Sequence, residues 1–144
     1  MSRALELARE AALIGEVPVG ALIVGPDKTI ISESFNLREK NKNALAHAEA
    51  LAIEQACQKL QRWRLHDCTL YVTLEPCFMC SGAIILARIP SVVYGATDPK
   101  AGAVKSLANV LNDSRLNHEC EVISGVFEEE SSQLLKDFFK ARRK

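Results

Sequence analysis

One imidazole and two thiols stand at spacings that could hold a metal ion. His47 is followed two positions later by Glu49, and Cys77 and Cys80 follow further along the chain. Zinc prefers histidine nitrogen and cysteine thiolate ligands. On a helix beginning near Pro76, the two cysteines would share one face, and the N-terminal helix dipole would favour their thiolate form. Three protein ligands leave one position open for water, which is the pattern of a catalytic zinc site.

These residues also carry a family resemblance. The pattern His47-x-Glu49 followed by Pro76-Cys77-x-x-Cys80 matches the signature of the zinc-dependent cytidine/deoxycytidylate deaminase superfamily, which is already established for nucleobase deaminases. From about residue 17 to residue 143, the chain resembles the bacterial tRNA-specific adenosine deaminases. The segments that carry this likeness are Asn36, Thr73-Leu74-Glu75-Pro76-Cys77, Met79-Cys80, Asp98-x-Lys100-x-Gly102-Ala103, Asn117-His118 and Asp137-Phe138-Phe139-x-x-Arg142-Arg143.

The resemblance implies hydrolytic deamination of the wobble adenosine (adenosine 34) of tRNA to inosine. It implies one Zn²⁺ per subunit, bound by His47, Cys77 and Cys80. Glu49 would carry a proton from the attacking water to the purine ring and then to the departing amino group. Similar enzymes are homodimers in which the anticodon stem-loop contacts both subunits. The residues implied in binding the nucleoside or the RNA are Asn36, Val19, Ala48, Asp98, Lys100, Asn117, His118, Arg142 and Arg143.

Two alternative functions stay open at this point. One is a deaminase of a free base or nucleoside, of the guanine or cytosine type, which would use the same metal chemistry without RNA. The other is a binding module with a structural zinc, which would need a fourth protein ligand. Suitable side chains are those of His66, Cys68, His118 and Cys120. None of them is spaced as a pair with Cys77 or Cys80, and this argues against a closed structural site.

One segment departs from the family pattern. Similar enzymes often have Asp-Pro-Thr directly before Ala-His-Ala-Glu, whereas here Asn43-Ala44-Leu45 takes that place. Without the proline, whose φ angle is fixed, the conformation of this loop is open. The proposed metal ligands are not affected.

Composition limits the protein class. A chain of 144 residues with 48% hydrophobic residues is expected to be one domain with a substantial core. Its 18 basic and 18 acidic residues balance, so attraction to nucleic acid would have to come from local basic groups in residues 38–42 and 136–144, which could equally be solvated surface. Five scattered cysteines and the absence of a signal-peptide pattern or a membrane-length apolar run indicate a soluble, cytosolic protein.

The hydrophobic pattern predicts the elements that would position these residues. Helices are expected over residues 2–14, 46–60, 77–87 and 128–144, with a short helix inside 97–116. Phe138 and Phe139 are expected to pack in the core, with one of them near the substrate. Strands are expected over residues 17–24, 29–35, 65–72, 91–95 and 121–124, the first two as a hairpin. The result is a three-layer α/β/α sandwich with a five-stranded mixed sheet, cytidine-deaminase-like, whose site lies beyond the strand carboxyl ends.

Overall fold

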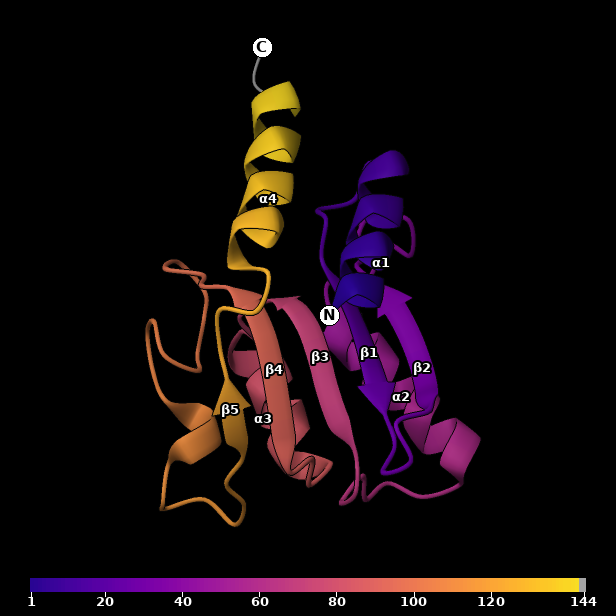
Figure 1. Cartoon of the computed structure of the whole chain (residues 1–144), viewed down its shortest axis with the longest axis vertical. Coiled ribbons are helices and arrows are strands. Elements are labelled where there is room, and N and C mark those ends of the chain that lie inside the picture. The colour runs from indigo at the N-terminus through magenta and orange to yellow at the C-terminus, as the bar shows by residue number, and fades with distance from the viewer. Residues whose placement is uncertain (143–144) are drawn as a thin grey trace.

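The computed structural model describes residues 1–142 and contains a five-stranded mixed sheet between two layers of helices (Figure 1). The strands are β1 (Gly20–Val24), β2 (Ile30–Phe35), β3 (Thr69–Leu74), β4 (Ser91–Ala96) and β5 (Glu121–Ile123). They lie in the order β2-β1-β3-β4-β5, with β1 antiparallel to both neighbours and β3, β4 and β5 parallel. The fold class expected from the sequence is confirmed.

Two helices cover each face of the sheet. The helices α2 (Ala48–Leu60) and α3 (Phe78–Leu86) lie on one face, and α1 (Ser2–Leu13) and α4 (Glu128–Arg142) lie on the other (Figure 1). A 3₁₀ turn, η1 (Val110–Asn112), packs against α3. The backbone of α1 approaches β1 closely because Gly20 has no side chain: a Cβ there would lie 2.1 Å from the carbonyl oxygen of Ala4. Among the described residues, no helix has both the length and the apolar character that crossing a membrane requires.

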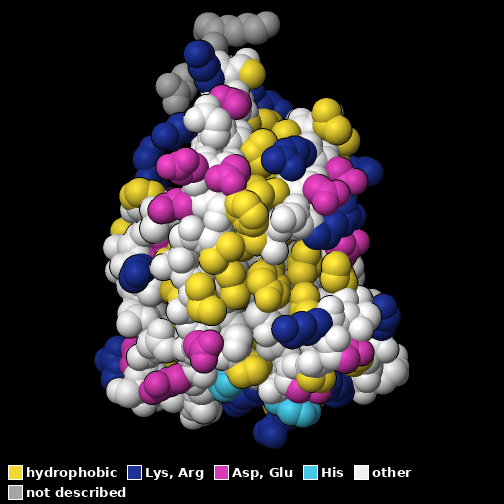
Figure 2. All heavy atoms as spheres, in the orientation of Figure 1, with side chains coloured by type: hydrophobic (Ala, Val, Ile, Leu, Met, Phe, Trp, Pro, Cys, Tyr) yellow, Lys and Arg dark blue, Asp and Glu magenta, His cyan; other side chains and the backbone are white. Residues whose placement is uncertain are grey.

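The main core lies between the sheet and the α2–α3 layer. Leu70 and Val72 of β3 and Val92 of β4 pack there against Ile84 of α3, and all four are fully buried. Tyr71, between the two core residues of β3, points to the α1 side instead, as strand alternation requires. Figure 2 shows hydrophobic side chains gathered over the middle of the sheet on this second face, which the two helices cover less completely.

Several element boundaries differ from the sequence prediction, and two of the differences matter for the site. The helices expected to start at residues 46 and 77 begin at Ala48 and Phe78, so that His47 and Cys77 are the N-cap residues with extended backbone. The third strand starts at Thr69, later than expected, and runs to Leu74. The short helix expected inside residues 97–116 is present as the 3₁₀ helix η1, and the preceding part of this segment forms turns.

Candidate metal centre and adjoining pocket

The starts of two helices bring the three predicted ligands together. His47 precedes α2, Cys77 precedes α3, and Cys80 lies in the first turn of α3. The Nδ1 atom of His47 lies 3.6 Å from Sγ of Cys77 and 3.5 Å from Sγ of Cys80. All three donor atoms lie within 4.8 Å of one another. The chain therefore places one nitrogen and two sulfurs around a common point.

The spacing of these atoms fits a tetrahedral metal ion. Zinc bond lengths of about 2.05 Å to nitrogen and 2.3 Å to sulfur, at a tetrahedral angle, put the two donors about 3.6 Å apart. His47 Nδ1 lies at this distance from both sulfurs. Hydrogen bonds from the Cys80 thiol and from His47 lower the pKa of Cys77 to about 3, so its sulfur is a thiolate, the form that binds metals. Three donors leave the fourth tetrahedral position for a ligand that is not protein.

A carboxyl group lies beside the three donors. Glu49, in the first turn of α2, is only 4% exposed. Burial raises its pKa to about 7, while the neighbouring His47 acts in the opposite direction. A carboxyl with such a pKa can both accept and donate a proton near neutral pH. The site therefore combines metal ligands with a proton carrier.

A pocket of about 570 Å³ adjoins the metal centre at the carboxyl ends of β3 and β4. Open α/β sheets bind their ligands at this edge. The residues that line the pocket come from six segments and are Val17, Val19, Asn36, Arg38, His47, Ala48, Glu49, Leu74, Glu75, Cys77, Thr97, Asp98, Pro99, Lys100, Ala101, Leu135 and Phe139. Five of the residues predicted to bind substrate are in this group: Asn36, Val19, Ala48, Asp98 and Lys100.

Other predicted contact residues lie elsewhere. Asn117 is exposed, and His118 places Nε2 2.7 Å from the carbonyl oxygen of Ile89, before the amino end of β4. Arg142 donates a hydrogen bond to the carbonyl of Gly15, and its guanidinium lies 4.4 Å from the centre of the Phe138 ring. None of these three is among the described residues that line the pocket. Arg143 lies outside the described residues.

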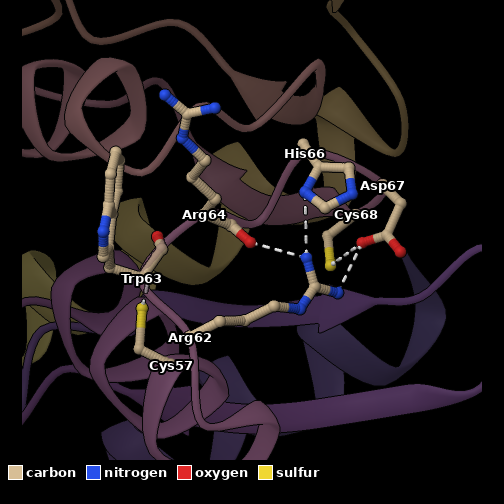
Figure 3. A network of polar contacts seen from close by, with 7 residues as sticks. All are labelled: Cys57, Arg62, Trp63, Arg64, His66, Asp67 and Cys68. Carbon is tan, nitrogen blue, oxygen red and sulfur yellow. Dashed lines mark hydrogen bonds and ion pairs between the residues drawn. The ribbon is translucent and has the colours of Figure 1, made fainter.

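The side chains considered as a fourth protein ligand are engaged away from the metal centre. His66 and Cys68 belong to a polar network at the turn between α2 and β3, where Arg62 contacts His66 Nδ1 at 3.1 Å and Asp67 at 2.8 Å (Figure 3). Cys68 donates to the same carboxylate of Asp67. The thiol of Cys120, like His118, contacts the carbonyl of Ile89. None of these side chains therefore joins His47, Cys77 and Cys80 as a fourth ligand, as an open site requires.

Phe139 lines the pocket and is 43% exposed, which agrees with the expectation that one of the two phenylalanines lies near the substrate but not with a place in the core. The contacts of Glu75 were not foreseen from the sequence. Glu75 is 2% exposed and accepts five hydrogen bonds, from the amides of Asp98, Val104, Lys105 and Ser106 and from the Ser106 hydroxyl. Burial alone would raise the pKa of Glu75, but the hydrogen bonds lower it to about 2, so the group is a carboxylate. The only sequence feature that could have marked Glu75 as important is its place at the end of a strand, directly before Pro76 and Cys77.

Comparison with known proteins places this arrangement in a family. The MafB19-like deaminase family model matches residues 1–143. The tRNA-specific adenosine deaminase of Bacillus subtilis (strain 168) is 49% identical over 144 residues, covering 100% of this chain and 89% of that protein. The Haemophilus influenzae protein of the same name is 48% identical over 143 residues, covering 99% and 83%.

A solved structure agrees with these relatives. It comes from a study of A-to-I editing by tRNA:A34 deaminases at the wobble position of transfer RNA. It superposes with a TM-score of 0.90 at 44% identity, over 94% of this chain and 97% of that chain. Because sequence identity approaches one half over the whole chain and the fold is shared, the chain belongs to the family of the tRNA-specific adenosine deaminases.

Proposed function

We propose that this chain hydrolyses the wobble adenosine of a tRNA to inosine, as a single zinc-dependent domain acting in the cytoplasm. The observation that carries the proposal is the tetrahedral spacing of His47, Cys77 and Cys80 beside Glu49 and an open pocket. The names of the relatives and of the neighbouring structure support tRNA as the substrate. The donor set supports zinc as the metal.

The reaction needs proton transfer at two atoms of the purine. When bound, zinc supplies a Lewis acid that lowers the pKa of a water molecule to about 7. The Glu49 carboxylate accepts a proton from the attacking water and donates it to ring N1, which makes C6 more electrophilic. After the oxygen of that water has bonded to C6, Glu49 accepts its remaining proton and donates it to the exocyclic amino group, so that the bond between C6 and the amino nitrogen breaks and ammonia leaves. Its buried position and raised pKa suit a group that changes protonation state twice.

The pocket walls would hold the target nucleoside. Val19, Ala48 and Asn36 line the pocket together with His47. The Asn36 side chain is oriented by contacts with the amide of Arg38 and the carbonyl of Val17, both at 3.4 Å. An amide group fixed in this way can recognise the edge or ribose of a nucleoside by hydrogen bonds.

An anticodon loop suits this pocket energetically. The target base must leave its stack to reach Glu49, and extrusion costs less from a single-stranded loop than from a duplex. Arg38 and Lys100 also line the pocket, on opposite loops. They give a neutral chain a local positive charge where phosphate groups would lie.

We also propose that the protein acts as a homodimer. The helix α3, which carries Cys80, exposes large apolar side chains: Phe78 is 54% exposed and Leu86 is 71% exposed. Leu45, in the loop before His47, is 60% exposed. A two-fold interface would remove these groups from water. In such a dimer Asn117 and His118 would be available to RNA held mainly by the other subunit.

The deciding experiment compares substrates. The zinc-loaded protein is incubated with an anticodon stem-loop that carries adenosine at the wobble position, and separately with free adenosine, guanine and cytidine. The proposal expects inosine in the stem-loop and no turnover of the free compounds. Turnover of guanine or cytidine would favour a free-base deaminase, and bound zinc without any turnover would favour a structural zinc module.

A further inference from the structure

Two buried carboxylates hold the two loops that flank the pocket. Glu16 is 1% exposed and Glu75 is 2% exposed, and neither takes part in the proton transfers described above. We propose that Glu16 and Glu75 are positioning residues, an inference that rests on the proposed function. They fix the two loops at the pocket mouth and thereby set the affinity for RNA. The chemical step depends on other groups.

Glu16 fixes the first loop. Its Oε1 accepts a hydrogen bond from the amide of Glu39 at 3.1 Å, and its Oε2 accepts one from Lys40 at 2.7 Å. These amides belong to a helical turn over residues 37–42, in which Asn36 accepts a hydrogen bond only from the amide of Arg38 and leaves the next two amides to Glu16. The buried carboxylate therefore acts as an N-cap supplied by another part of the chain. The same turn carries Arg38 into the pocket wall.

Glu75 fixes the opposite loop in a similar way. Its Oε2 accepts the consecutive amides of Val104, Lys105 and Ser106 at 3.1, 2.8 and 2.9 Å. Its Oε1 accepts the amide of Asp98 at 2.9 Å, at the other end of the loop. One side chain thus joins both ends of the segment that presents residues 98–101 to the pocket. The fit is close, since a Cβ at Gly102 would lie 2.3 Å from the carboxylate carbon.

Losing either carboxylate would leave backbone donors without partners. Buried or half-buried amides without an acceptor are costly, so the loops would rearrange until water satisfied them. Arg38 and Lys100 would then lose their fixed positions, and RNA binding would have to order the loops again, which weakens affinity. The metal ligands start α2 and α3, outside both loops, so metal binding would persist.

Electrostatics alone predicts the opposite result. Glu16→Gln removes one negative charge beside a basic loop, and a less negative surface should bind a polyanion more tightly. The loop offers a matched control, because Glu39 has an exposed side chain on the same turn. Glu39→Gln makes the same charge change without removing an acceptor from the amides. For Glu16→Gln, a positioning role therefore predicts weaker RNA binding, whereas the change of charge alone predicts tighter RNA binding.

The experiment measures KM and kcat of the zinc-loaded protein on the anticodon stem-loop, together with zinc content. For Glu16→Gln we expect KM to rise about tenfold relative to Glu39→Gln, with kcat within about threefold and zinc content unchanged. For Glu75→Gln the same change is expected relative to Glu119→Gln, whose side chain is exposed. A KM equal to that of the matched control, or lower, would overturn the proposal for that residue.

A second variant and a second measurement guard against a folding defect. Glu16→Asp keeps the charge but draws the carboxylate back, so that it cannot reach both amides, and we expect an intermediate KM. Hydrogen exchange at the amides of Glu39 and Lys40 should quicken in both variants and stay unchanged in Glu39→Gln. Unchanged exchange would overturn the proposal, as would failure of both variants to fold.

The proposed function is judged on the wild-type protein alone. If wild type does not deaminate the stem-loop, the proposed function fails and the positioning role falls with it. If wild type is active and the variants match their controls, only the positioning role fails.

Discussion

Nδ1 of His47 lies 3.5 Å from Sγ of Cys80, although 33 positions separate the two residues along the chain. The contact joins the N-terminal end of α2 to the first turn of α3. Both ends carry the positive pole of a helix dipole, which favours a thiolate between them. A cation bound there would balance the thiolate charge and connect the two helices.

Replacing Cys80 should remove both the metal and much of the stability. Cys80→Ala leaves two ligands, so we expect zinc content well below one ion per chain and unfolding free energy lower by about 2–4 kcal/mol. Metal analysis and thermal melting measure the two effects. Cys120→Ala is the control, because Cys120 is also buried but lies outside the donor cluster. Full zinc occupancy in Cys80→Ala with an unchanged melting temperature would show that the ligands are assigned wrongly.

Glu49→Gln should separate binding from chemistry. The amide keeps the shape of the side chain but cannot move protons, so we expect the single-turnover rate to fall by about 10²–10⁴-fold. Zinc content and RNA affinity should stay near wild type. Glu54→Gln, on the exposed side of α2, provides the control. A Glu49→Gln rate within a few-fold of that control would exclude Glu49 as the proton carrier.

The pocket cations should determine the salt dependence of RNA binding. Contacts to phosphate release counterions, so the logarithm of the affinity falls linearly with the logarithm of the salt concentration. In Arg38→Gln/Lys100→Gln we expect weaker binding and a slope smaller by about one unit for each phosphate that the variant no longer neutralises. The control variant Lys59→Gln/Arg64→Gln has the same charge change near the turn after α2, away from the pocket. Parallel titrations with equal slopes would argue against RNA binding at Arg38 and Lys100.

The proposed dimer makes a prediction for α3. Leu86→Lys places a charge on its exposed apolar surface, and we expect a shift from dimer to monomer in light-scattering or sedimentation measurements. Leu13→Lys is the matched control, because Leu13 ends α1 and is 86% exposed. Zinc content should be the same in both variants. If Leu86→Lys sediments as wild type does, α3 does not supply the interface.

The sequence predicted the donor cluster well because its chemistry is local and its residue types are rare. His47 and the two cysteines have few structural roles that would fit the same spacing. The segment order and the parallel crossover between β3 and β4 likewise followed from hydrophobic runs and their lengths. The predicted first residues of the helices were less accurate, because His47 and Cys77 occupy N-cap positions that Ser, Thr, Asp or Asn usually hold.

There is a physical reason why the roles of Glu16 and Glu75 in holding the loops could not be predicted from the sequence. Glu75 bonds to backbone amides, which every residue except proline possesses, so no pattern of side-chain types marks its partners. The sequence predicted a core position for both phenylalanines, with one near the substrate, but could not say which one, because an amphipathic stripe does not reveal that α4 extends beyond the ends of the strands (Figure 1).

The backbone bonds of Glu16 and Glu75 have a consequence for protein engineering. Apart from the Ser106 hydroxyl, the groups that donate to these carboxylates are loop amides, and the side chains of Arg38, Lys40 and Lys100 take no part, so the conformation of each loop is largely independent of these three side chains. Randomising Arg38, Lys40 and Lys100 in a library should therefore vary the recognised RNA while the scaffold and the metal centre stay intact. Substitutions at Gly102 should be left out of such a library, because any side chain there would displace the carboxylate beneath it.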